Sequence, residues 1–289
     1  LTSTGSGAIT FGNTLNGAQT LAVNTSGATT FTGAVGGTIA LTSLSTDAGG
    51  TVAINGGVVN TTGAQSFSDA ATLGADTTLT STGSGAITFG STLNGAQALA
   101  VNTSGITTFG GAVGGATDAN QRNVGALSSL TTDKGTAGSV AINGGSVTTT
   151  GIQNYGEAVT MSQATTLTAS GVTFGSAVDG DSSLDVVGNT AMNGARITTA
   201  GYQHYGGAVT LGDHTTLNAG AGDVTFDSTV DTSANANAAK SLTVTTTGAT
   251  TFNGVVGSAV TNSINTGALS SLTTTAAVGA NPGSVTFNQ

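Results

Sequence analysis

The stretch from Leu79 to Gly115 reads LTSTGSGAITFGSTLNGAQALAVNTSGITTFGGAVGG and repeats, with four differences, the stretch from Leu1 to Gly37. Large apolar residues recur at one spacing within both copies, since Phe109 follows Phe89 at the same interval as Phe31 follows Phe11. Such internal repetition is typical of a solenoid, in which each repeat buries its apolar residues against the next.

Local patterns indicate strands separated by tight corners. Segments such as Ala86–Phe89 and Ala98–Val101 alternate large apolar residues with small or polar ones, which is the period of a strand with one buried face. Ser-Gly, Asn-Gly and Gly-Gly pairs lie between these segments, and the chain contains 47 glycines. No segment has a sustained helical spacing, so we expect an all-β fold.

We therefore predict one continuous β-solenoid repeat region over residues 1–289, a parallel β-helix of about 20 residues per coil and about 14 coils. Polar stretches near 116–124, 231–240 and 258–266 are expected to be insertions at corners. Because both ends lie within the repeat pattern, we expect the chain to be a fragment of a longer one. Leu is expected to stack on Leu and Phe on Phe, giving a core ladder of Leu1, Leu21, Leu41, Leu79, Leu99, Phe11, Phe31, Phe89 and Phe109.

A second motif recurs three times around a glutamine, at Gln65, Gln153 and Gln203. Each glutamine follows a Gly-x pair and precedes an aromatic residue by two positions. Tyr155 and Tyr205 therefore occupy the position of Phe67, and we expect all three rings in the core.

The second motif resembles the repeats of large bacterial exoproteins of the filamentous-haemagglutinin type. The resemblance rests on Thr149–Tyr155, followed by Ala158–Met161 and Thr165–Leu167, and it extends over nearly all of the chain. It implies a right-handed parallel β-helix that is secreted through an outer-membrane partner. It also implies an extracellular or cell-surface role in adhesion, aggregation or biofilm matrix.

Charge and composition exclude several partners. The formal net charge is −9 with only four Lys and Arg residues, so no basic stripe is available for nucleic acid. No apolar run approaches the ~20 residues of a membrane-spanning helix, so we expect no membrane insertion. Cysteine is absent, which excludes disulfides and Cys-ligated zinc. We predict no cofactor and no catalytic residues.

Asp179, Asp181 and Asp185 form the densest acidic cluster, and its Asp-x-Asp start resembles a calcium loop. The cluster lacks the terminal bidentate Glu, so a solvated loop is the favoured interpretation and a weak calcium site the alternative. His204 and His214 have no recurring third ligand beside them, which favours solvent-facing positions on strands.

The repeats favour a structural or adhesive rod of a secreted bacterial surface protein, with other copies or cell-surface and matrix components, glycans among them, as partners. The first alternative is a segment of an extracellular filament assembled end to end, and a remote one is ice or crystal binding by threonine ladders. Tyr202 is a candidate for stacking on a sugar. An enzyme is not expected, because glycoside hydrolysis needs two carboxylates at a fixed separation and the chain has one Glu and scattered Asp residues.

Overall fold

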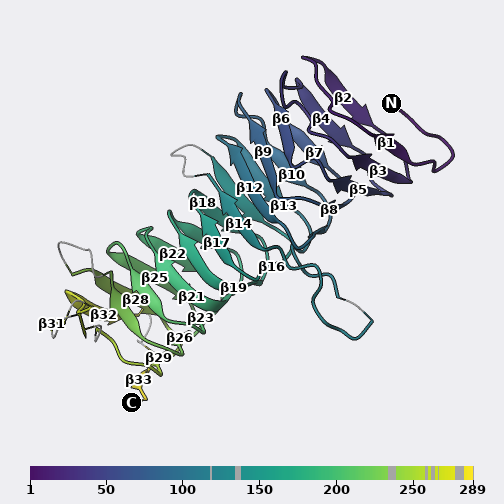
Figure 1. Ribbon diagram of the computed structural model, residues 1–289. Helices are drawn as coiled ribbons and strands as arrows, with labels where there is room; N and C mark the ends of the chain where they lie inside the picture. Colours follow the sequence, from purple (N-terminus) through teal and green to yellow (C-terminus); the bar gives the residue numbers. More distant parts are fainter. Residues whose placement is uncertain are drawn as a thin grey trace. The chain divides into compact units, whose positions relative to one another are not determined.

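The chain folds as an all-β parallel β-solenoid of about 10 turns with about 21 residues per turn. The computed structural model describes residues 1–117, 119–133, 138–233, 239–257, 260–261, 264–265, 267–276 and 283–288. Contacts group the chain into two compact units, Leu1–Gly151 and Ile152–Gln289. Within each unit the strands of successive turns lie side by side (Figure 1).

The strands of the N-terminal unit form three parallel sheets, named A, B and C. Sheet A contains β1 (Ile9–Phe11), β3 (Ala28–Phe31), β5 (Thr51–Ile54), β8 (Ala70–Leu73) and β11 (Leu93–Asn94), and single bridges through Val113 extend it to β16 (Ser146–Thr148). Sheet B contains β2 (Thr20–Val23), β4 (Ser43–Thr46), β7 (Gln65–Phe67), β10 (Ile87–Phe89), β13 (Ile106–Phe109) and β15 (Ser139–Ile142). Sheet C contains β6 (Val58–Thr61), β9 (Thr77–Ser81), β12 (Ala98–Thr103) and β14 (Ser129–Thr132).

The C-terminal unit also has three parallel sheets, named D, E and F. Sheet D contains β18 (Ala158–Met161), β20 (Val178–Gly180), β22 (Arg196–Thr199), β25 (Thr215–Gly220), β28 (Ser241–Thr246) and β32 (Ser271–Thr275). The long strands β19 (Thr165–Phe174) and β21 (Leu184–Met192) each serve two sheets. Their first halves belong to sheet E with β23 (Gln203–Tyr205), β26 (Val224–Phe226), β29 (Thr250–Phe252) and β33 (Val285–Phe287). Their second halves belong to sheet F with β17 (Ile152–Tyr155), β24 (Val209–Leu211) and β27 (Val230–Thr232).

The core is built from aromatic and aliphatic side chains that stack turn on turn. Most strands alternate a buried residue with a less buried one, as the sequence pattern predicts. Phe89 lies in register with Phe67 and Phe109 on the two neighbouring turns, with ring centroids 5.2 and 5.9 Å apart. Phe226 and Phe252 stack in the same way at 4.9 Å in the C-terminal unit. Offset stacking of this kind adds to the burial of each ring.

Most members of the expected core ladder are inside, but one is not. The buried members are Leu41, Leu79, Leu99, Phe31, Phe89 and Phe109, and Phe11 and Leu21 are half-buried. Leu1 is 63% exposed, so its placement in the core is corrected. The physical reason is that only one turn lies against it, through the bridge from Thr2 to Asn24.

The expected stacking of each ladder leucine on the next is also corrected. Leu21 pairs with Leu44, and Leu79 pairs with Val101, so successive leucines of the ladder are not direct neighbours. Register partners lie further apart along the chain wherever a turn carries an insertion, as from Thr107 to Val140. For the same reason the chain makes about 10 turns, fewer than the sequence spacing predicts.

The near-identical copies of the long repeat occupy different sheets of the N-terminal unit. Ile9–Phe11 lies in sheet A, whereas its copy Ile87–Phe89 lies in sheet B. Thr20–Val23 lies in sheet B, and its copy Ala98–Val101 lies in sheet C. The offset between the copies is therefore not a whole number of turns, and the same sequence folds alike on different faces.

The expected insertions lie only partly within the described residues. The segment 116–124 returns on itself, since Thr117 bridges Asn123 and the Asn123 side chain donates to the Gly114 carbonyl at 2.7 Å. In 258–266, β30 (Val260–Thr261) pairs antiparallel with β31 (Ile264–Asn265). The remainder of 258–266, and residues 234–238 of the stretch 231–240, fall outside the described residues.

Close approach between turns requires glycine at particular corners. A Cβ added to Gly194 would lie 2.0 Å from the carbonyl oxygen of Ser176 on the preceding turn, a distance that no relaxed structure allows. A Cβ on Gly171, in β19, would meet only the Asn189 carbonyl at 3.8 Å, an ordinary contact.

We predict that Gly194→Ala lowers the free energy of unfolding by about 1–3 kcal/mol, because the turns must move apart to admit the methyl group. Gly171→Ala is the matched control and should change it by less than about 0.5 kcal/mol. Urea denaturation followed by circular dichroism measures both. Equal effects of the two substitutions would contradict the stated role of Gly194.

Candidate functional site

Corner Asp and Asn side chains bind backbone amides of the neighbouring turn. Asn16 Oδ1 accepts the amide of Thr38 at 2.9 Å, and Asn94, its equivalent in the second copy, accepts the amide of Ala116 at 2.9 Å. Aspartates make the same kind of contact, since Asp223 Oδ1 accepts the amide of Ala249 at 2.7 Å. These polar groups satisfy exposed backbone donors that would otherwise need water.

The repeated glutamines are fully buried, and each makes the same kind of contact. The side-chain amide bonds to backbone carbonyls of the neighbouring strands, and this arrangement is called the glutamine bracket. Gln65 Nε2 donates to the carbonyls of Val59 at 3.1 Å and Thr80 at 2.9 Å. Gln203 Nε2 repeats this geometry six positions before it and fifteen after it, at 3.3 and 2.9 Å. Gln153 Nε2 makes the bond fifteen positions after it at 3.0 Å. One amide group thus satisfies buried carbonyls on two turns.

The bracket is not confined to one face of the solenoid. Gln153 pairs with Val172 in sheet F, whereas Gln203 pairs with Leu184 in sheet E. The motif therefore works on both sheet E and sheet F of the C-terminal unit.

Tyrosine completes two of the three brackets. The hydroxyls of Tyr155 and Tyr205 each donate to the Oε1 atom of the glutamine two residues earlier, at 3.0 Å. Both rings are in the core, as expected, and burial raises the pKa of each phenol. Phe67 has no hydroxyl, and Gln65 Oε1 is buried with no hydrogen-bond partner among the described residues.

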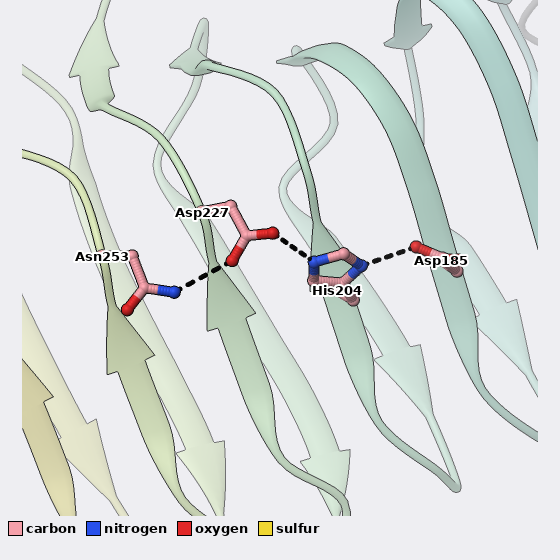
Figure 2. A network of polar contacts seen from close by, with 4 residues as sticks. All are labelled: Asp185, His204, Asp227 and Asn253. Carbon is pink, nitrogen blue, oxygen red and sulfur yellow. Dashed lines mark hydrogen bonds and ion pairs between the residues drawn. The ribbon is translucent and has the colours of Figure 1, made fainter.

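Four side chains on the outer side of sheet E form a continuous polar ladder along successive turns (Figure 2). His204 Nδ1 lies 2.7 Å from Asp185 Oδ1, and His204 Nε2 lies 2.8 Å from Asp227 Oδ2. Asn253 Nδ2 donates to Asp227 Oδ1 at 2.9 Å, and Asn288 continues the series by donating to Asn253 Oδ1 at 2.8 Å.

This ladder shifts the pKa values of two of its members. Partial burial is the largest single effect on His204 and opposes its charged form, but the hydrogen bonds and charges of Asp227 and Asp185 together outweigh it. The pKa of His204 is therefore raised above 6.5. The hydrogen bond from His204, followed by that from Asn253, lowers the pKa of Asp227.

The structure separates the acidic residues of the calcium hypothesis. Asp179 pairs with Arg196 at 2.8 Å on sheet D, and Asp185 contacts His204 on sheet E. Within the described ranges, no group of three or more His, Cys, Asp or Glu residues could hold a metal ion. The other histidine, His214, accepts from the amide of Ser241 and does not join the ladder.

A shallow depression of about 140 Å³ lies on the outer side of sheet F, where Gly171 and Ala191 carry little or no side chain. Ile152, Thr173, Asn189 and Thr210 are among the residues that surround it. Tyr202, the candidate for sugar stacking, is 47% exposed but does not line this depression.

We predict that Tyr155→Phe and Tyr205→Phe each lower the free energy of unfolding by about 1–3 kcal/mol, because each leaves a buried amide oxygen without a donor. Phe67→Tyr should raise stability, since the new hydroxyl reaches Gln65 Oε1. Tyr202→Phe is the exposed control and should change little. Urea titrations of the four variants measure these effects, and a loss at Tyr202 as large as that at Tyr155 would refute the bracket.

No helix in the described parts of the chain has the length and apolar character needed to cross a membrane. Comparison of the chain with protein-family models, with curated proteins and with solved structures finds no match.

Proposed function

We propose that this chain is a structural and adhesive segment of an exported bacterial surface protein, which holds cells or matrix through many weak contacts. The observation that carries the proposal is the placement of the two repeat copies on different sheets. A repeated surface that recurs around the turn suits contacts in several directions. The likeness of the glutamine motif to haemagglutinin-type repeats supports the same assignment.

The outward residues of the repeat illustrate this arrangement. Thr10 pairs with Thr30 on sheet A, and their copies Thr88 and Thr108 pair on sheet B. Each pair presents two hydroxyls and two methyl groups on a neighbouring pair of strands. The same chemical surface is thus displayed on two sides of one unit.

Binding through such pairs is weak at each site and strong in combination. Only 6% of the residues are charged, so the repeated surface offers hydroxyl and amide groups and few ions. Neutral hydroxyl-rich partners, such as matrix or cell-surface glycans, match these groups. Several linked sites raise the overall avidity well above the affinity of one.

The placement of the two repeat copies on different sheets does not favour ice binding by a threonine ladder. That function needs threonines aligned on one flat face, whereas the two threonine pairs of the repeat lie on different sheets.

Adhesion to a surface coated with the full chain tests the proposal. Labelled bacterial cells should be retained several-fold more than on an unrelated protein coat. T10A/T30A and T88A/T108A should each reduce retention by a similar factor of about 2–5, and the fourfold variant by at least the product of the two. Circular dichroism checks that each variant is folded.

Two outcomes would count against this function. Retention no greater than on the unrelated coat would remove adhesion, and complete loss in only one double variant would indicate a single site instead of a repeated surface. Sedimentation of the chain tests the filament alternative. Large end-to-end assemblies would favour a filament, whereas adhesion by a chain that sediments as a monomer needs no assembly.

A further inference from the structure

The polar ladder of sheet E has a feature that the adhesive role does not require. His204 on β23 lies between Asp185 on β21 and Asp227 after β26, so its ring connects three consecutive turns (Figure 2). Both ring nitrogens are within 2.8 Å of a carboxylate oxygen. The ring is about one third exposed, so protons reach it from solvent.

The chemistry of imidazole determines the charge state of this arrangement. A neutral ring carries one N–H, so one of the two contacts would place a nitrogen lone pair against a carboxylate oxygen. Only the imidazolium form donates to both carboxylates. Its two hydrogen bonds are then charge-assisted and shorter than neutral ones.

We propose that Asp185, His204 and Asp227 form a proton-operated brace, which clamps three turns of the C-terminal unit while His204 is protonated and releases them when it is not. The brace spans the outer side of sheet E, opposite the buried side chains of Gln203 and Tyr205. Deprotonation removes one donor and sets a lone pair against a carboxylate, which separates the outer edges of the turns.

The charged groups beside the ring both favour its protonated form. β21 contributes Asp185 and the end of β26 contributes Asp227, and both are acidic. Asp223, the residue before β26, accepts the amide of Ala249. Arg196 forms an ion pair with Asp179 on sheet D.

These shifts define a pH window. The pKa of His204 is raised above 6.5, so its contribution to stability is complete below pH 6.5 and is lost as the pH rises through the folded-state pKa. The pKa of Asp227 is lowered below 3.8, so its contribution is complete above pH 3.8 and is lost as the pH falls through its folded-state pKa. The brace is strongest between these limits and weakens as the pH rises through the raised pKa of His204.

NMR titration of the full chain tests the proton site directly. The chain has two histidines, so the ring signals that remain in H214Q are those of His204. We expect the titration midpoint of His204 to lie above 6.5 and to fall in D185N/D227N. A midpoint at or below 6.5, or one that D185N/D227N leaves unchanged, would overturn the proposal.

Thermal unfolding tests the mechanical consequence. The midpoint temperature of the unmodified chain should fall between pH 6 and pH 9, and this fall should be reduced in H204Q. H214Q leaves the brace in place and is the matched control, so the fall should be larger in H214Q than in H204Q. An equal fall in H204Q and in the unmodified chain would show that the ring does not clamp the turns. If H204Q fails to fold, the NMR titration still decides.

Discussion

In-register pairing of each turn with the turns before and after it is the constraint on which the rest of the structure depends. A turn of about 21 residues cannot enclose its own apolar side chains, so it must bury them against like positions one turn away. Phe67, Phe89 and Phe109 meet this condition as one stack. The backbones at the corners then approach so closely that Gly194 has no room for a side chain.

The three sheets of a turn are nearly equivalent, and this explains how one sequence serves several faces. A strand in any sheet needs an alternating pattern, a small corner residue and a like partner one turn away. The segment Ile9–Phe11 and its copy Ile87–Phe89 satisfy these conditions in sheets A and B alike. Duplication of a segment therefore need not add whole turns, which frees the repeat length from the turn length.

Sequence patterns predicted the strands, the corners and the phenylalanine stacks, but the register only in part. Leu21 meets Leu44 because corners differ in length, and spacing along the chain measures register only where all corners match. The same limit hid most of the candidate site, since Asp185, His204 and Asp227 are separated by 19 and 23 residues and no motif joins them. The glutamine motif was visible, but its amide partners are backbone carbonyls, which any residue supplies. The tyrosine two residues after the glutamine was the one sequence signal of the hydrogen bond from its hydroxyl to the glutamine Oε1.

Turn-to-turn bonding also determines what the outer surface can do. Asn16 and Asp223 direct their oxygens to amides one turn away, so these polar groups contribute to cohesion before they can contribute to binding. The proposed adhesion uses instead the repeated hydroxyls, of which Thr10 and Thr88 are examples. His204 differs because its bond to each neighbouring turn depends on a proton. Acidity of the medium thus sets the strength of contact between turns at His204, whereas contacts such as those of Asn16 depend on no proton.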